Sequence, residues 1–276
     1  MNDSTLVKHY SHGQILDAIR AGITALCKST DTITIDDLAA VDEFHIGGRE
    51  ATEHLVDQLA LAPGNSVLDV GCGLGGTARF VAETCGCRVV GIDLTPEFVK
   101  TGQALTSWVG LDDRVTLQQG SALDMPFGAR EFDAATMLHL GMNIADKSKL
   151  FTEVHRVLKP GCPFGIYDIM RTSDEALDYP VPWAKDQKLC VLGTLGDYRS
   201  ALHDASFEIL HELNRREFAA DFFAAMRERM QSAEGPPPLG LHILFGEDAP
   251  LKVKNMVGNI AAGRAAPIEV IARTTS

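Results

Sequence analysis

A glycine-rich segment offers the clearest chemistry in the sequence. The run Val67–Val70 has the apolar character of a buried strand, and it is followed by Gly71, Gly73 and Gly76 before a stretch that favours a helix from about residue 77 to 84. Glycine permits positive φ and lets a ligand approach the backbone, while the start of a helix offers free N–H groups. The segment predicts a nucleotide-binding turn, but its G-x-G-x-x-G spacing also occurs in dinucleotide-binding enzymes.

Two carboxylates beside this turn narrow the choice of ligand. Asp69 lies just before the first glycine, where its charge would repel a pyrophosphate but would attract the ammonium group of a methionine moiety. Asp93 ends the next predicted strand, where an acidic side chain accepts hydrogen bonds from ribose hydroxyls. The structural alternative for Asp93 is a helix cap for the segment that begins at Thr95. Together the carboxylates favour a ligand with a ribose and an ammonium group over a dinucleotide.

Strand and helix patterns alternate around the turn. Residues 63–170 hold five short runs with strand character, and helical patterns separate most of them. These runs are Val67–Val70, Arg88–Ile92, Val115–Gln118, Phe132–Met137 and Phe164–Asp168. The alternation is typical of βαβ units on a parallel sheet. We therefore expect an α/β fold. With two further strands predicted after residue 170, it should have a doubly wound, mostly parallel seven-stranded sheet and helices on both faces.

The segments on either side of this core predict additional structure. Residues 1–62 predict an N-terminal helical lid, with helices near 13–27 and 49–60 and a loop at 42–48. Residues 171–276 predict inserted cap segments and the C-terminal strands that complete the sheet. Helices are expected there near 196–205, 217–230 and 252–262, and strands at 208–213 and 268–272. We expect the three segments, 1–62, 63–170 and 171–276, to form a single domain.

Composition and charge exclude several classes of protein. A formal net charge of -12 argues against nucleic acid as the main substrate, because binding to phosphates needs clustered Lys and Arg. We find no signal peptide and no run of roughly 20 apolar residues, so we expect a cytoplasmic protein without a membrane partner. The six cysteines lack the spacing of a disulfide framework or a zinc site. We therefore expect reduced thiols and no metal.

Four segments, in order, resemble motifs of the class I S-adenosylmethionine-dependent methyltransferases. Residues 67–76 resemble the first motif of that family and residues 91–93 the second, while 120–127 resemble the adenine-side segment and 156–161 the turn before the fifth strand. The likeness is close over about residues 60–170 and loose elsewhere. It implies S-adenosyl-L-methionine as the cofactor and a small molecule as the methyl acceptor.

The resemblance also implies a set of cofactor contacts. These are Asp69, Gly71, Gly73, Asp93, Leu94, Ser121, Ala122 and Met137. Many members of the family have an Asp, which usually binds the adenine amino group, where this chain has Ser121. A serine hydroxyl can still accept one hydrogen bond. We therefore expect a weaker adenine contact, in which the backbone of Ala122 takes a larger part.

The segment after Met137 is expected, from the resemblance, to face the transferred methyl group. His139 could remove a proton from an ammonium or hydroxyl group, because an unperturbed histidine has a pKa of about 6.5. A structural alternative is a histidine bonded to a neighbouring backbone carbonyl. Asn143 follows four residues later and would share a face with His139 if the segment were helical. His139 is thus the candidate base and Asn143 a candidate substrate contact.

Other candidate acceptor contacts lie outside the core. His45 fits a lid segment of the family that closes over the cofactor, and Trp183 could line a substrate pocket through its apolar area or a cation–π contact. Tyr10 and His12 could also belong to the lid, and Arg171 could pair with a substrate carboxylate. Structural packing, or a surface position in the case of Arg171, is the alternative for each.

The lid and the insert look most like the small-molecule branch of the family. Within that branch the chain resembles the sarcosine and dimethylglycine N-methyltransferases and natural-product methyltransferases. In the N-methyltransferases the position of His139 is often acidic, so this histidine leaves O- and C-methylation open beside N-methylation. Two alternatives remain: a repurposed or non-catalytic S-adenosylmethionine binder, and an NAD-dependent oxidoreductase, which Asp69 disfavours. We expect a monomer or a homodimer.

Overall fold

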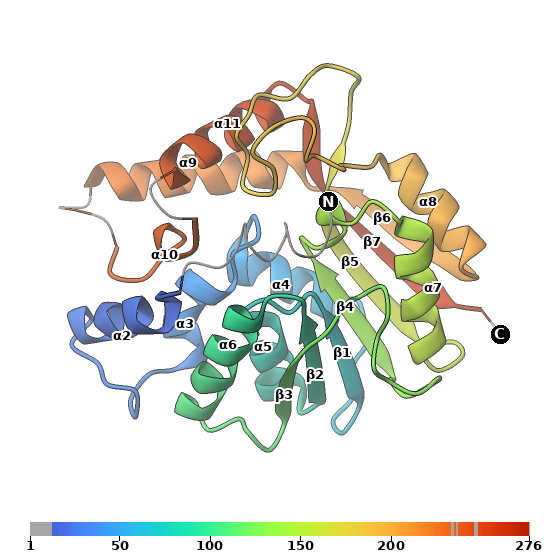
Figure 1. The fold of residues 1–276 in the computed structure, drawn as a ribbon, viewed down its shortest axis with the longest axis horizontal. Helices are drawn as coiled ribbons and strands as arrows, with labels where there is room; N and C mark the ends of the chain where they lie inside the picture. Colours follow the sequence, from blue (N-terminus) through green and yellow to red (C-terminus); the bar gives the residue numbers. More distant parts are fainter. Residues whose placement is uncertain (1–12, 233–234, 236, 246–247, 276) are drawn as a thin grey trace.

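A seven-stranded sheet forms the centre of the computed structural model, which describes residues 13–232, 235, 237–245 and 248–275. The strand order is β3-β2-β1-β4-β5-β7-β6 (Figure 1). The strands are β1 (Ser66–Val70), β2 (Arg88–Asp93), β3 (Val115–Gln119), β4 (Ala134–Leu138), β5 (Pro163–Arg171), β6 (Phe207–Asn214) and β7 (Ala265–Thr274). Only β7 runs antiparallel to its neighbours β5 and β6. The expected doubly wound, mostly parallel sheet is confirmed.

Helices cover both faces of the sheet, which is why its central strands are apolar almost throughout. One face carries α4 (Gly48–Asp57), α5 (Gly76–Cys85) and α6 (Pro96–Trp108), and the other carries α7 (Lys147–Val157) and α8 (Leu195–Asp204). Successive residues of β1 alternate between the two: Val67 packs in the cluster that includes α5, and Leu68 in the cluster that includes α7 and α8. None of the described helices combines the length and apolar character needed to cross a lipid bilayer.

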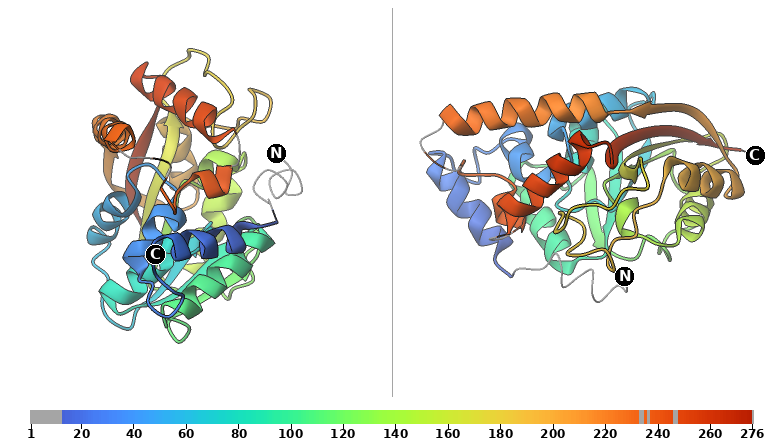
Figure 2. Two further views of the ribbon diagram at one scale, coloured as in Figure 1. Left: turned by 90° about the vertical axis from the view of Figure 1, so that its left-hand side faces the viewer. Right: turned by 90° about the horizontal axis from the view of Figure 1, so that it is seen from above.

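Two further groups of helices lie beyond the sheet at the end where β1, β2 and β4 finish (Figures 1 and 2). The first contains α2 (Ile15–Ala25) and α3 (Ile35–Asp42), and the second contains α9 (Arg216–Ser232), α10 (His242–Phe245) and α11 (Ala249–Ala261). Ile19 of α2 packs in one apolar cluster with Leu244 of α10 and Ala249 of α11. The lid and the C-terminal helices therefore meet, although they are far apart in the chain. The expected boundary after residue 62 falls between α4 and β1, and that after residue 170 falls at the end of β5.

Helix α3 was not predicted from the sequence. Its first turn is fixed by a reciprocal capping box, in which Thr34 Oγ1 accepts from the Asp37 N–H at 3.3 Å and Asp37 Oδ2 accepts from the Thr34 N–H at 3.0 Å. A helix of 8 residues gives too few turns for a clear apolar repeat. The cap pattern Thr-x-x-Asp was the signal available in the sequence. The short helix α10 was missed for the same reason.

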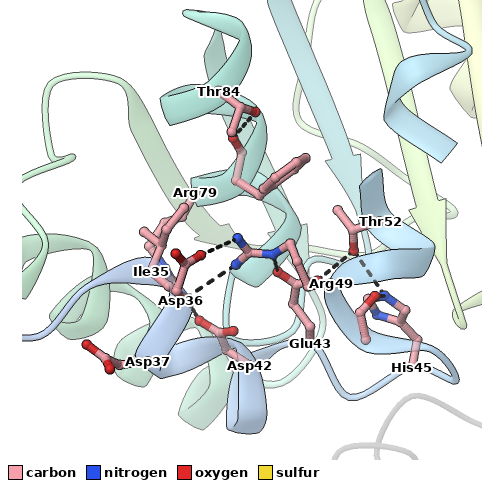
Figure 3. Close-up of polar contacts among 12 residues, drawn as sticks. Ile35, Asp36, Asp37, Asp42, Glu43, His45, Arg49, Thr52, Arg79 and Thr84 are labelled. Atoms are coloured by element: carbon pink, nitrogen blue, oxygen red, sulfur yellow. Dashed lines mark hydrogen bonds and ion pairs between the residues drawn. The ribbon is translucent and has the colours of Figure 1, made fainter. Parts of the chain in front are cut away.

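A buried ion pair joins the lid to the helix that follows the glycine turn (Figure 3). Arg79 of α5 is fully buried and donates from Nη2 to Asp42 Oδ2 at 2.5 Å and to the Leu74 carbonyl at 2.8 Å. Its Nη1 donates to the Gly102 carbonyl and to Thr106 Oγ1 on α6, at 3.2 and 3.0 Å. One side chain thus fixes the lid, the glycine turn and α6 against each other.

We expect Arg79→Met to destabilise the protein by about 3–5 kcal/mol, because it leaves the buried Asp42 carboxylate without its charge partner. Urea unfolding followed by circular dichroism measures the change. Arg199→Met is the matched control, since it removes an arginine whose pair with Glu212 lies at the surface. Equal losses in the two variants would contradict a special role for the buried pair.

Candidate active site

A cavity of about 2230 Å³ lies beyond the carboxyl ends of β1, β2 and β4, the edge at which parallel α/β sheets bind ligands. Its lining comes from the lid at residues 39–50, the glycine turn, the ends of β2 and β4, the Pro182–Trp183 segment, and α9 to α11. Ligand pockets usually measure about 300–1000 Å³. The space therefore exceeds what one ligand of ordinary size needs.

The glycine turn has the backbone that its sequence predicted. Gly71 and Gly73 have positive φ values of 76° and 54°, and the N–H groups of Gly71 and Cys72 donate to the Ile92 carbonyl at 2.8 and 3.0 Å. A Cβ on Gly73 would lie 2.8 Å from the Phe44 ring of the lid. The turn therefore needs glycine both for its conformation and for the close approach of the lid.

Asp93 links the turn to the start of α6. Its Oδ2 accepts from the Gly73 N–H at 3.0 Å, and its Oδ1 accepts from the Thr95 N–H at 2.8 Å. The capping role that was the structural alternative is thus present in the backbone contact with Thr95. Asp93 and Leu94 also line the cavity, and each carboxylate oxygen has a second lone pair for a ligand.

Asp69 is the buried carboxylate at the base of the cavity. Thr136 Oγ1 donates to its Oδ1 at 2.9 Å, while Oδ2 is buried and has no hydrogen-bond partner among the described residues. Burial raises the pKa of Asp69 to about 7. A buried carboxylate oxygen without a partner is costly. It suits a ligand that brings a positively charged donor.

His139 lies where β4 ends and has a positive φ of 51°. Its ring stacks on that of Tyr167, with centroids 5.3 Å apart, and meets His45 edge-on at 5.9 Å. Its Nε2 is buried without a hydrogen-bond partner in the described part of the chain. Burial, with a smaller contribution from His45, holds the pKa of His139 well below its usual range. The imidazole is therefore neutral at pH 7.

The remaining acceptor-side candidates also line the cavity. His45 comes from the lid, Asn143 from the 3-10 helix Gly141–Asn143, and Trp183 from the segment after β5. Trp183 is 2% exposed, and its Nε1 is buried without a hydrogen-bond partner among the described residues. His139 precedes the 3-10 helix, so it does not share a helical face with Asn143. The structure nevertheless brings all three residues and His139 to one cavity.

Asp168 was not singled out from the sequence, yet it fixes the segment that carries Asn143. Its Oδ2 accepts from the Met142 N–H at 3.0 Å and from the Tyr198 hydroxyl at 2.7 Å. Burial raises the pKa of Asp168 to about 6. An acidic residue near the carboxyl end of a central strand was the only signal in the sequence.

Three predicted cofactor contacts lie outside the cavity lining. The Met137 side chain is fully buried in the core, and Ala122 packs against the same apolar cluster. Ser121 Oγ accepts from the Leu123 N–H at 3.3 Å within a turn. Contacts of these residues with a ligand stay predictions.

The other candidate site residues from the sequence either lie away from the cavity or fall outside the described residues. Arg171 ends β5, is half-buried and does not line the cavity. Tyr10 and His12 lie outside the described residues. All six cysteines are free thiols. In the described ranges there is no group of three or more His, Cys, Asp or Glu side chains placed to hold a metal ion.

Residues 67–161 match the model of a family described as a methyltransferase domain. This segment contains the glycine turn, Asp69, Asp93 and His139. The chain carries a methyltransferase domain. Erythromycin 3''-O-methyltransferase of Saccharopolyspora erythraea is 39% identical to it over 129 residues, which is 45% of this chain. The match covers 42% of that protein, so this chain spans less than half the length of the curated relative.

The likeness to solved structures extends beyond residues 67–161 to most of the chain. Geranyl diphosphate C-methyltransferase from Streptomyces coelicolor A3(2) superposes with a TM-score of 0.71 at 18% identity, over 99% of this chain and 98% of that one. A putative sarcosine dimethylglycine methyltransferase from Galdieria sulphuraria gives a TM-score of 0.65 at 22% identity, over 83% and 85% of the two chains. The class I methyltransferase fold that the motifs implied is confirmed.

We expect Asp69→Asn to stabilise the ligand-free protein at pH 8 by about 1–3 kcal/mol, because it removes a buried charge with an unsatisfied oxygen. The folded-state pKa is raised from 3.8 to about 7, so between these values the unfolded state has lost a proton that the folded state retains. This carboxyl therefore lowers the stability of the native protein as pH rises through that range.

Urea unfolding between pH 5 and pH 8 measures both effects. Asp133→Asn is the matched control, because Lys159 lowers the pKa of Asp133 and that variant should instead lose stability at pH 8. An Asp69→Asn variant with the native stability and the native pH dependence would contradict the assignment.

Proposed function

We propose that this chain is an S-adenosylmethionine-dependent methyltransferase that acts on a small molecule with a large apolar part. The observation that carries the proposal is the pair of carboxylates at the glycine turn, in a chain that carries a methyltransferase domain. The buried, unpartnered Oδ2 of Asp69 fits the ammonium group of the methionine moiety. Asp93, at the end of β2, fits the ribose hydroxyls.

The remaining cofactor contacts follow once Asp69 is assigned to the ammonium group and Asp93 to the ribose. Gly71 and Gly73 let the ligand approach the backbone, and Leu94 lines the cavity beside Asp93. Ser121 and Ala122 are assigned to the adenine end. These residues would hold the cofactor, and the segment after β4, where the Met137 backbone precedes His139, would then lie beside the methyl group that it supplies.

S-adenosylmethionine supplies a methyl group bound to a positively charged sulfur. As the acceptor atom bonds to the methyl carbon, the carbon–sulfur bond breaks and its electron pair goes to sulfur. An O–H or N–H acceptor must also lose a proton, and we assign the unpartnered Nε2 of His139 to receive it. The neutral imidazole at pH 7 is the form that can do so. We assign Asn143 and Trp183, which line the same cavity, to orient the acceptor.

The outer wall of the cavity favours an acceptor with a large apolar part. Apolar side chains of α9 and α11, with Leu241 before α10, line this wall: Phe222, Phe223, Met226, Leu241, Val253 and Val257. Burial of such surface on binding contributes about 25 cal/mol for each Å² removed from water. The relatives named above include O- and C-methyltransferases of a macrolide and an isoprenoid.

A methyl-label transfer screen tests the proposal. The protein is incubated with methyl-labelled S-adenosylmethionine and pools of apolar phenols, alcohols, carboxylates, amines and carbon acids, and label transfer and S-adenosylhomocysteine are measured. We expect transfer to at least one apolar acceptor. Binding of S-adenosylmethionine without transfer to any pool would instead support a repurposed or non-catalytic binder.

Replacement of Asp93 by Ala should weaken the binding of S-adenosylhomocysteine about 10- to 100-fold, because a hydrogen bond to a charged group contributes about 1.5–3 kcal/mol. Isothermal titration calorimetry measures the change. Asp113→Ala, at an exposed carboxylate, is the control. Native affinity in Asp93→Ala would remove Asp93 from the ribose site.

Loss of the His139 imidazole should lower turnover about 10²- to 10⁴-fold while S-adenosylhomocysteine affinity is kept, because proton transfer by a positioned side chain contributes a factor of that size. His139→Asn is the better variant beside His139→Ala, since Asn tolerates the positive φ at this position. Initial rates and calorimetry give the two quantities. Full turnover in both variants would exclude His139 as the base.

A further inference from the structure

The imidazole of His45 is held on one side by partners that decide where its hydrogen lies. Its Nε2 is 3.0 Å from the Gly48 carbonyl and 3.0 Å from Thr52 Oγ1 (Figure 3). A carbonyl can only accept a hydrogen bond. Nε2 must therefore carry the hydrogen for the contact with Gly48 to form.

Glu43 decides how Thr52 takes part. The Thr52 hydroxyl is buried and donates to Glu43 Oε2 at 2.7 Å. A hydroxyl has one hydrogen to give, so Thr52 Oγ1 faces His45 as an acceptor. Both neighbours of Nε2 thus favour the same neutral tautomer, and the Nδ1 lone pair is left for other contacts.

The Glu43 carboxylate is itself anchored. Arg49 pairs with its Oε1, and the guanidinium lies 4.7 Å from the centroid of the Phe80 ring. Arg49 also donates to the Ile35 carbonyl at 3.3 Å and pairs with the exposed Asp36 at 3.1 Å. Burial raises the pKa of the Glu43 carboxyl, and Arg49 opposes this rise. The anion is thereby held beside Thr52.

On its other side His45 faces the cavity. The His139 and Tyr167 rings lie edge-on to it, with centroids at 5.9 and 6.2 Å. The Nδ1 atom makes no hydrogen bond to the residues that the structure describes. Burial lowers the pKa of His45 to about 4, with the Gly48 contact and Asp42 opposing this fall and Arg49 adding to it. A neutral ring with a free lone pair therefore lines the cavity.

We propose that Glu43 and Thr52 are positioning residues that keep the hydrogen of His45 on Nε2, so that Nδ1 accepts a hydrogen bond from an O–H or N–H group of the methyl acceptor. This proposal rests on the proposed function. It assigns a selective role to the lid, because an acceptor without a donor at that place leaves the Nδ1 lone pair of His45 unpaired. It is separate from the proton transfer assigned to His139.

The tautomer can be measured without any substrate. Two-bond ¹H–¹⁵N correlation spectra of the full chain distinguish Nε2–H from Nδ1–H imidazoles, and His45→Gln identifies the signal. We expect the Nε2–H form in the native protein at pH 7. In Glu43→Gln the Thr52 hydroxyl is no longer committed to an anion and can donate to Nε2, so the Nδ1–H form should appear.

A second change should reverse the effect of the first. Thr52→Val removes the competing hydroxyl and leaves the Gly48 carbonyl, so the double variant Glu43→Gln/Thr52→Val should return to the Nε2–H form. Asp36→Asn is the matched control for Glu43→Gln, because it removes the other carboxylate of Arg49 and leaves Thr52 untouched. Circular dichroism and S-adenosylhomocysteine titration confirm that each variant is folded.

Kinetics with an acceptor from the screen provide the second readout. We expect Glu43→Gln to raise KM for the acceptor about 3- to 10-fold, the contribution of one hydrogen bond, with kcat and cofactor affinity little changed. The double variant should recover part of this loss, and Asp36→Asn should behave as the native protein.

An Nδ1–H tautomer in the native protein, or a Glu43→Gln variant with the native spectrum, would overturn the positioning role. Native acceptor KM in that variant would overturn the role in acceptor binding. Failure of the methyl-label screen would count against the proposed function alone, since the spectra report the tautomer in the absence of any acceptor.

Discussion

The ion pair between Arg79 and Asp42 is the interaction on which the rest of the site depends. Both charges are removed from water, and such a pair is tolerated only when further hydrogen bonds satisfy it. Arg79 meets this condition in part, through the Leu74 and Gly102 carbonyls. Its Nε and the Oδ1 of Asp42 are buried without a hydrogen-bond partner among the described residues. The Leu74 contact reaches the glycine turn directly. The ion pair therefore fixes the lid against the turn. It also fixes the position of the lid residues after Asp42 that line the cavity, among them Glu43 and His45.

The cavity has two kinds of wall, which follow from where its elements begin and end. The floor is made where parallel strands finish, so carboxylates and histidines from β1, β2 and the segment after β4 gather there. The outer wall is made by α9 and α11, whose apolar side chains line it together with charged ones such as Arg227 and Lys254. Burial acts on both kinds of titratable group there: it raises the pKa of Asp69 and lowers that of His139 in the floor, and it lowers that of His45 in the lid. The floor is accordingly poor in charge until a ligand arrives.

Much of the architecture could be predicted because its signals are local. The five runs of strand character in residues 63–170 correspond to β1 to β5, and the glycine turn has the positive φ values that its glycines allow. Helix α3 was not predicted, because a helix of eight residues shows little periodicity in its apolar residues. The motif predicted that Ser121, Ala122 and Met137 contact the cofactor. In the structure, core packing orients the side chains of Ala122 and Met137, and a local turn orients that of Ser121. That packing depends on residues from other strands, which a motif does not contain.

The sequence by itself determined the alternation of strands and helices in residues 63–170, the glycine turn and the presence of two carboxylates beside it, since each depends on neighbouring residues. Only the tertiary structure decided that Asp69 keeps one oxygen without a partner, that Asp168 holds the segment before α7, and that Glu43 and Thr52 orient His45. The physical reason is that burial and hydrogen-bond partners are properties of a three-dimensional neighbourhood. Asp69 meets Thr136 from 67 residues away, and Arg79 meets Asp42 from 37 residues away. No local sequence pattern encodes contacts between residues so far apart in the chain.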